Sequence, residues 1–215
     1  MGKKEAGARE LLRGSHLKKS EALRRLKEEN RKLKEDSRSL FSPIKIGNLN
    51  LKNRTIMAPM ATGFATEDGQ PTKRQIQHYL ERARGGVGLI VVEGSAISAE
   101  GRSAINRLGL YDDHQTGVHQ ELVKALHSVG TPVCAQLHHA GAVAPASISG
   151  QFPVSCSAVP LFSRAGSTPG NTPRRLSERD IQELVTKFSD AALRAKTCGY
   201  DAVMVHAGHG YLIHQ

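Results

Sequence analysis

The chain has 215 residues, is 39% hydrophobic, and carries 30 Lys and Arg against 20 Asp and Glu, which gives a net charge of +10. This apolar content excludes a wholly disordered chain, and the length suits one ordinary domain, with or without a tail. No apolar run reaches the ~18 residues of a membrane span, and no signal peptide opens the chain. We therefore expect a soluble, cytoplasmic protein without membrane contact.

The first 40 residues form a basic arm with 13 basic and 7 acidic side chains, whereas residues 41–215 are only mildly basic. Residues 15–40 are predicted to form one charged helix, supported by pairs such as Glu28 and Lys32 four positions apart. The apolar repeat is too short for a coiled coil. A solvated helix, a partner helix and a nucleic-acid contact remain open. The arm has no aromatic residue to stack on a base, which argues against nucleic acid.

After the arm, strands and helices are predicted to alternate. Four apolar runs predict strands: 55–60, 87–93, 133–137 and 201–206. Helical spacing predicts helices from Thr72 to Arg84, from Asp112 or Asp113 to Gly130, and from Ser177 to Cys198. The order β-α-β-α-β-α-β indicates an α/β protein with a parallel sheet and right-handed crossovers.

Local signals mark the ends of these helices. Thr72 with Gln75 and Ser177 with Asp180 have the spacing of capping boxes. The segment 140–176 is rich in Pro, Ser, Gly and Ala, and a loop of this length is usually functional or disordered. The three cysteines contain no C-x-x-C pair and are odd in number, so we expect free thiols without a disulfide or a cysteine metal site.

Candidate site residues, most of them polar or glycine, collect where the predicted strands end. The residues concerned are Ala58, Pro59, Met60 and Ala61; Glu93 and Gly94; Gln136, His138 and His139; and His206, His209 and Tyr211. The carboxyl ends of parallel strands meet at one rim, where α/β proteins bind their ligands. Adjacent strand residues point to opposite faces, so at most one of His138 and His139 addresses this rim.

Several roles are open for these residues. His206 and His209 could be half of a metal site, or histidines of a helix cap or the core, but no carboxylate ligand stands near them. A flat ligand fits better. The Gln136 amide can donate to and accept from the edge of a ring, neutral imidazoles can hold a carbonyl oxygen, and the Tyr211 phenol can supply a proton.

Four motifs in order resemble the old yellow enzyme family, in the branch with NADH:flavin oxidoreductases, enoate reductases and 2,4-dienoyl-CoA reductases. They are LFSPIKIGNLNLKNRTIMAPM, RARGGVGLIVVEGSAISAEGR, QLHHAG and VHAGHGYLIHQ, and they extend from about residue 40 to the last residue. The resemblance implies a TIM (β/α)8 barrel with FMN over the carboxyl-terminal rim.

The resemblance also implies roles for individual residues. The segment Ala58–Ala61 would follow the flavin, and Gly94 and Gln136 would contact its ring. His206 and His209 would bind the activating carbonyl of the substrate, and Tyr211 would protonate its α-carbon. Hydride would pass from flavin, reduced by NADH or NADPH, to the β-carbon of an unsaturated carbonyl or enoyl substrate.

The sequence departs from the family pattern in two respects. HAGR, which is usual in the family, is replaced by His139-Ala140-Gly141-Ala142, so one positive charge near the site is lost. The chain also supplies only about four of eight strands, and neither the later phosphate-binding loops nor the four-cysteine iron–sulfur motif is present. We therefore expect residues 41–215 to be the N-terminal half of a TIM barrel, a partial FMN-binding domain behind the arm of residues 1–40.

An incomplete barrel is expected to need a complementary half-barrel or a second copy of the chain. The alternative is a catalytically inactive half-barrel, a binding or assembly module whose basic arm recruits a partner.

Overall fold

The computed structural model describes residues 21, 23–35, 39–160 and 172–215. They fall into two units, of which the first takes in the described residues up to Ile44 together with Lys52–Arg54. The second unit comprises Lys45–Leu51 and Thr55–Gln215. Within the described ranges, no helix is long and apolar enough to cross a membrane.

The described part of the arm is helical at residue 21 and over 23–35, and its side chains are exposed. The Arg31 guanidinium lies 2.6 Å from Glu28 Oε1 and 2.9 Å from Glu35 Oε1, which links three turns of the helix. Glu28 thus pairs with Arg31 rather than with the predicted Lys32. Most of the remaining predicted helix lies outside the described residues.

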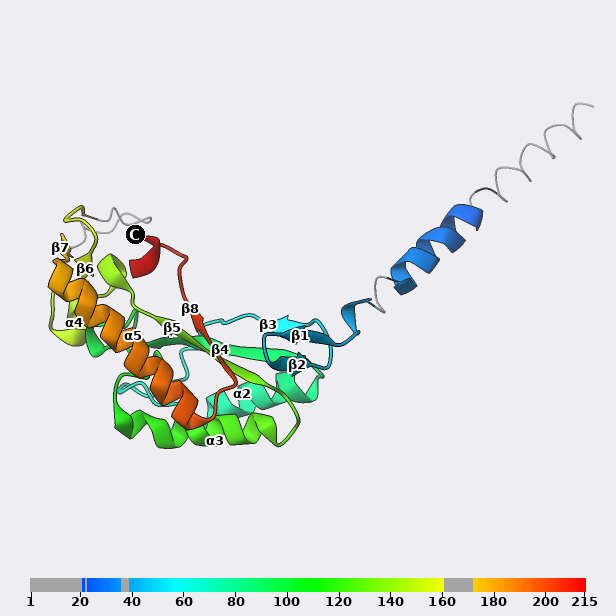
Figure 1. The fold of residues 1–215 in the computed structure, drawn as a ribbon, viewed down its shortest axis with the longest axis horizontal. Coiled ribbons are helices and arrows are strands. Elements are labelled where there is room, and N and C mark those ends of the chain that lie inside the picture. Colours follow the sequence, from blue (N-terminus) through cyan, green and yellow to red (C-terminus); the bar gives the residue numbers. More distant parts are fainter. Residues whose placement is uncertain (1–20, 22, 36–38, 161–171) are drawn as a thin grey trace, which may run out of the picture. The chain divides into compact units, whose positions relative to one another are not determined.

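A four-stranded parallel sheet forms the centre of the second unit (Figure 1). Its strands, in spatial and chain order, are β3 (Ile56–Met57), β4 (Leu89–Ala96), β5 (Val133–His138) and β8 (Ala202–Val205). This order confirms the predicted alternation of strands and helices. The strand predicted over 87–93 is displaced, because β4 begins at Leu89 and continues beyond Glu93, through the polar residue Ser95, to Ala96.

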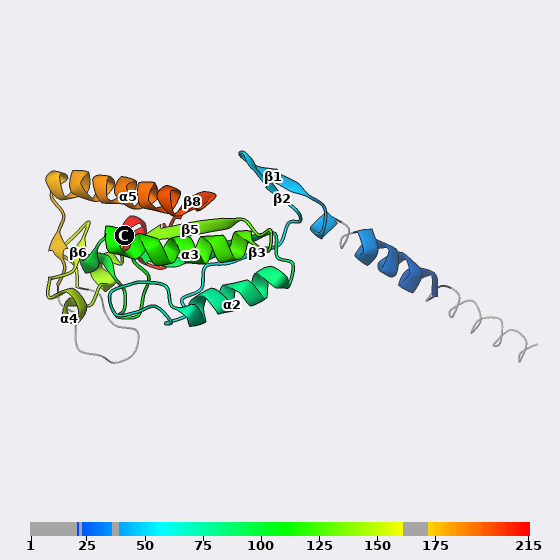
Figure 2. The same cartoon turned by 90° about the horizontal axis from the view of Figure 1, so that it is seen from below.

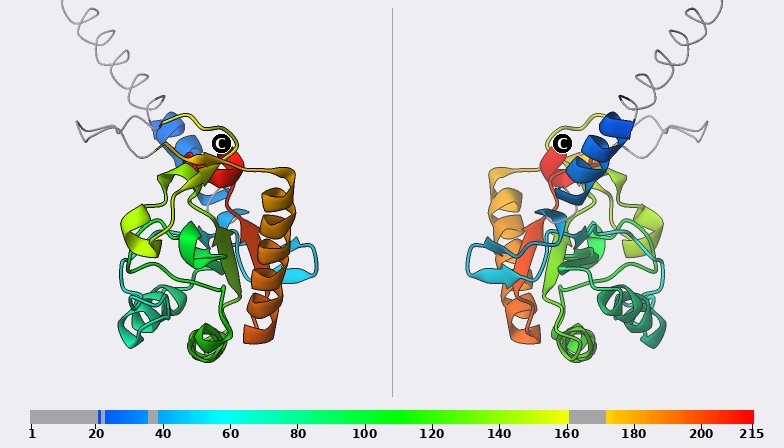
Figure 3. Two further views of the ribbon diagram at one scale, coloured as in Figure 1. Left: turned by 90° about the vertical axis from the view of Figure 1, so that its left-hand side faces the viewer. Right: turned by 90° about the vertical axis from the view of Figure 1, so that its right-hand side faces the viewer.

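Three helices connect these strands and pack against the sheet (Figures 2 and 3). They are α2 (Lys73–Arg84), α3 (Thr116–His127) and α5 (Glu178–Cys198). The Ser177 hydroxyl accepts from Asp180 N and the Asp180 carboxylate accepts from Ser177 N, so the predicted capping box is confirmed. Gly199 then ends α5 with φ +92°, a conformation that glycine adopts without strain.

Asp112 begins a short 3-10 helix rather than α3 itself. Its carboxylate accepts from His114 N, and the Gln115 amide oxygen accepts from Asp112 N at 3.2 Å. This turn, η2, spans Asp113–Gln115, and α3 follows directly.

The structure contains elements that the sequence did not predict. Strands β1 (Ile44–Ile46) and β2 (Leu49–Leu51) pair with each other. The segment 140–176, predicted as a loop, contains η3 (Gly141–Val143), α4 (Ala146–Ser149) and the strands β6 (Val154–Ser155) and β7 (Arg174–Arg175), which pair in parallel. Two further 3-10 turns are η1 (Ala99–Gly101) and η4 (Leu212–His214).

The two faces of the sheet have different surroundings. On one face Ile90, Val92, Ala135 and Leu137 are buried in the main apolar core with residues of α2, α3 and α5. The opposite face lines one cavity at the carboxyl ends of the strands and, further toward their amino ends, a second open cavity of about 530 Å³. At the two outer strands Ile56, Val203 and Val205 are exposed, so the sheet presents apolar side chains at both edges.

Candidate active site

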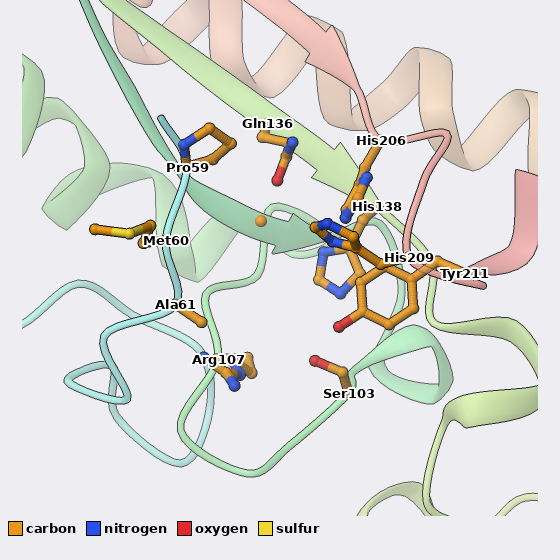
Figure 4. A pocket seen from close by; sticks show the side chains of 11 residues that line it. Pro59, Met60, Ala61, Ser103, Arg107, Gln136, His138, His206, His209 and Tyr211 are labelled. Carbon is orange, nitrogen blue, oxygen red and sulfur yellow. The ribbon is translucent and has the colours of Figure 1, made fainter. Parts of the chain in front are cut away.

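A cavity of about 320 Å³ lies at the carboxyl end of the sheet (Figure 4). Its volume is in the range of small-molecule sites. The lining residues are Pro59, Met60, Ala61, Gly94, Ser103, Arg107, Gln136, His138, His206, His209 and Tyr211. Eight of the nine residues predicted for cofactor, substrate and catalysis are therefore gathered in one cavity. Ala58, the ninth, is exposed and does not line it.

The segment that carries Ala61 is held by a buried carboxyl group. Glu93 is fully buried on β4 and accepts hydrogen bonds from Thr62 N and, at 2.5 Å, from Gln75 Nε2. The Glu93 amide donates to the Tyr79 hydroxyl at 3.0 Å. Burial raises the pKa of the Glu93 carboxyl, against the effect of these donors and of Arg107. Glu93 thus fixes the backbone one residue beyond Ala61.

This arrangement corrects the prediction for Gln75. Thr72 does cap α2, because its hydroxyl accepts from Gln75 N at 3.3 Å. The Gln75 side chain, however, does not return to Thr72 to complete a capping box. It is buried and donates to Glu93 instead, which satisfies a carboxyl group that would otherwise be costly to bury.

Gly94 provides space at the floor of the cavity. A Cβ atom at this position would lie 2.7 Å from His138 Nδ1 and 3.4 Å from Gln136 Oε1. The pairing of β4 with β5 also shifts here, between Val92 and Ser95, as in a β-bulge. Among the described residues, the Gln136 side chain makes one hydrogen bond, from Nε2 to Met204 Sδ at 3.5 Å, and a thioether sulfur is a weak acceptor. Its polar atoms are therefore largely left for a ligand.

Three aromatic side chains after β8 form one wall. The rings of His206 and His209 meet edge to face at 5.0 Å between centroids, and so do those of His206 and Tyr211. The backbone of His209 is left-handed, with φ +57°, which is uncommon for a residue other than glycine and is often found at functional sites. Burial, followed by the neighbouring His209, lowers the pKa of His206. Its imidazole is therefore neutral at pH 7.

His138 and His139 point to different places, as predicted for adjacent residues on a strand. His138 lines the cavity, and its ring is stacked on Tyr211 at 5.3 Å with 27° between the planes. His139 lies against Gly101, and its Nδ1 accepts from Gly141 N at 3.0 Å. Only His138 belongs to the site.

Sequence reasoning assigned no role to three of the lining residues: Ser103, Arg107 and His138. His138 was placed near the rim by the sequence, because it alternates with Gln136 and so shares its face of β5, but that position did not indicate a role. Ser103 and Arg107 come from the irregular segment between β4 and α3, where no periodicity marks which side chains point inward. Across the described residues, no group of three or more His, Cys, Asp and Glu is arranged to hold a metal ion.

Comparison with known proteins identifies relatives of this chain. Residues 39–215 match the model of the NADH:flavin oxidoreductase / NADH oxidase family. An NADH oxidase of Thermoanaerobacter brockii is 43% identical over 179 residues, which are 82% of this chain and 27% of that protein. An NADPH dehydrogenase of Listeria monocytogenes serotype 4a (strain HCC23) is 40% identical over 179 residues, 82% of this chain and 50% of that protein.

Solved structures agree with these matches. An old yellow enzyme homologue from Zymomonas mobilis has a TM-score of 0.75 and 36% identity, covering 81% of this chain and 50% of that one. Morphinone reductase in complex with tetrahydroNAD gives 0.74 and 34%, with the same coverage. The predicted fold, a partial TIM barrel, is thereby confirmed. The chain spans about half the length of these structures and of the Listeria protein.

Proposed function

The chain belongs to the NADH:flavin oxidoreductase / NADH oxidase family, and from this premise we propose that it is part of an FMN-dependent NAD(P)H oxidoreductase that reduces activated alkenes. The observation that carries the proposal is the single cavity shared by Ala61, Gly94, Gln136, the histidine pair and Tyr211. A flavin ring, a carbonyl-binding group and a proton donor would then meet at one place.

The residues present fit FMN. Gly94 has no side chain where a flat ring must approach, and the Gln136 amide offers both a donor and an acceptor to a pyrimidine edge. Glu93 holds the backbone at Thr62, so the segment from Pro59 to Ala61 has a fixed course along this edge of the cavity. When bound, FMN supplies the transfer of hydride between NADH or NADPH and the substrate.

The chain's own residues would bind and protonate the substrate. The imidazoles of His206 and His209 would donate N–H groups to the activating carbonyl oxygen and stabilise the negative charge that develops on it. Tyr211 lies against His206 and carries an O–H group at the same wall. It would donate that proton to the α-carbon, while the β-carbon receives hydride.

We expect activity only when the sheet is completed by a complementary half-barrel or a second copy of the chain. Support comes from the exposed apolar residues at the outer strands, namely Ile56 on β3 and Val203 and Val205 on β8. Open parallel-sheet edges of this kind favour association.

The test is FMN binding, measured by absorbance during titration, with the molar mass followed by light scattering. We expect weak retention of FMN by the chain as a monomer and one FMN per completed barrel. Gln136→Leu should weaken binding, whereas Gln77→Leu on the exposed face of α2 is the matched control and should not. A monomer that retains one FMN contradicts the need for completion, and a completed assembly that binds none contradicts the flavin proposal.

A second candidate function is favoured by the arm. Leu23, Leu26 and Leu33 are 55–65% exposed on its helix, which is the pattern of a surface that binds a partner helix. In that case the chain would serve as a binding or assembly module. Deletion of residues 1–40 should then abolish an interaction or change the oligomeric state, and an unchanged state would rule this function out.

A further inference from the structure

The cavity is lined by three polar side chains that the proposed reaction does not use. Ser103 and Arg107 come from the segment between β4 and α3, and His138 is the last residue of β5. Figure 4 shows Ser103 and Arg107 across the cavity from Pro59 and Gln136. They lie at the opposite end from the residues expected to hold the pyrimidine edge of a flavin.

His138 is buried without a hydrogen-bond partner among the described residues. It is only 2% exposed, and neither Nδ1 nor Nε2 makes a hydrogen bond there. An unpaired buried polar group is costly, and most such groups in proteins have a partner. Since the ring also lines the cavity, a ligand is the natural partner. Burial, followed by the electrostatic influence of His206, His139 and Arg107, lowers the pKa of His138 to about 3, so the neutral ring offers one donor and one acceptor.

Arg107 is a cation without a carboxylate partner in the described part of the chain. Arg174 and Arg194 each have one, at 2.7 Å from Asp180 and from Asp113 respectively, whereas exposed arginines such as Arg84 have none among the described residues. No Asp or Glu lines the cavity. The nearby carboxyl group of Glu93 already accepts from Thr62 and Gln75. The positive charge of Arg107 is therefore left facing the cavity.

We infer that Arg107, together with Ser103 and His138, binds a carboxylate of the substrate that is separate from the carbonyl held by His206 and His209. The guanidinium supplies charge and a fork of N–H donors, and the serine hydroxyl and the imidazole N–H add single donors. The preferred substrates are unsaturated carbonyl compounds with a carboxylate at their other end. The binding of the carbonyl by His206 and His209 rests on the proposed function. The binding of the carboxylate rests on Arg107, Ser103 and His138.

The experiment compares two probes of the same shape on the full chain, with and without FMN. 4-Formylbenzoate carries a carbonyl and a carboxylate at opposite ends, and 4-formylbenzamide carries the same carbonyl and a neutral amide. Dissociation constants are measured by calorimetry. We expect the carboxylate probe to bind about ten-fold more tightly, as for a charge-assisted contact. Arg107→Gln should bring this ratio close to one.

Two controls keep the result specific. Arg84→Gln removes one positive charge from an exposed position of α2 and should leave the ratio unchanged. Circular dichroism of each variant shows whether it folds. His138→Leu is a second variant that should reduce the ratio without removing a charge. Equal binding of the two probes, no measurable binding of 4-formylbenzoate, or a preference that survives Arg107→Gln would each overturn the inference.

The result is independent of the proposed function. A carboxylate preference that depends on Arg107 in a chain that binds no FMN upholds the subsite and counts against the flavin enzyme. NADPH is measured on the same variants, because its phosphates are another source of anionic oxygen. If Arg107→Gln weakens NADPH binding and leaves the probe ratio intact, the arginine serves the nicotinamide cofactor and the inference fails.

Discussion

Two buried histidines show how the core and the rim of this protein differ. His119 on α3 is fully buried, and its ring nitrogens contact the Tyr200 hydroxyl at 2.8 Å and the Gly109 carbonyl oxygen at 3.0 Å. His138 is buried almost as completely, and neither of its nitrogens has a partner in the described residues. The His119 imidazole makes its hydrogen bonds within the protein and therefore has a structural role. The His138 imidazole has no such bonds, which fits the proposed role in binding a ligand.

The largest effect is expected from His119→Ala. The substitution leaves a cavity beside α3 and removes the partner of Tyr200 and Gly109, and it should lower the free energy of unfolding by about 4 kcal/mol. Urea denaturation measures this loss. His138→Leu is the contrasting variant and should change stability by less than about 1 kcal/mol, because it removes a group that is already unpaired. Equal losses of stability in the two variants would contradict the conclusion that His119 has a structural role and His138 does not.

The next largest effect is expected from acid, which should lower the stability of the folded protein through His119. Burial lowers the pKa of His119 to about 4, against 6.5 for an exposed histidine, so as the pH falls the unfolded chain takes up a proton before the folded one. The contribution of neutral His119 to the free energy of unfolding is therefore complete above pH ~6.5. It falls by about 3 kcal/mol as the pH decreases to ~4. His119→Gln should flatten that slope. An identical slope in the variant would refute the assignment.

At the rim, Tyr211→Phe tests chemistry rather than stability. In the completed enzyme we expect alkene reduction to slow about 100-fold, equivalent to about 2.7 kcal/mol, because the proton donor is gone. Flavin reduction by NADH or NADPH should keep its rate, since it does not need this proton. Stopped-flow absorbance separates the two half-reactions. An equal loss in both would contradict the role of Tyr211 as proton donor.

The smallest effect is expected from Gly94→Ala, which tests the close approach of Gly94 to His138. Gly94→Ala places a Cβ 2.7 Å from His138 Nδ1 and should cost about 1 kcal/mol of stability while the histidine is present. In a His138→Ala background the same substitution should cost close to nothing. The double-mutant cycle thus reports this contact directly. Additive effects would mean that Gly94 is needed for another reason.

Sequence patterns predicted the elements that have strong local signals. The alternation of β3, α2, β4, α3, β5, α5 and β8 was predictable from the helical spacing of apolar residues and from caps such as Ser177 with Asp180. The pairing of β1 with β2 was missed, although Gly47, with φ +57°, stands between them as a turn residue. Gln75 was misread because its cap spacing fits equally well with a side chain that turns inward to Glu93.

The site was predictable where it lies on strand ends and unpredictable where it lies on loops. Gln136 and His206 follow from the position of their strands. Arg107 does not, because an irregular segment has no period from which inward-pointing side chains can be deduced. The sequence indicated that one positive charge near the site is lost, because residues 139–142 read HAGA in place of HAGR. The structure shows that another cation, Arg107, lines the cavity from a different segment.

The shift in pairing between Val92 and Ser95 sets which residues of β4 share the face of His138. Val92 pairs with Ala135 and Ser95 with Leu137, so β4 takes three steps where β5 takes two. If the same residues ran in an unbroken ladder, Ser95 would pair with His138 and lie on the face that Ala96 now shares with it. Loss of one residue at this point would therefore restore a regular ladder and leave Ser95 opposite Leu137, while Leu89 to Val92 kept their places. The bulge thus accommodates one additional residue without changing which later side chains of β4 face the core.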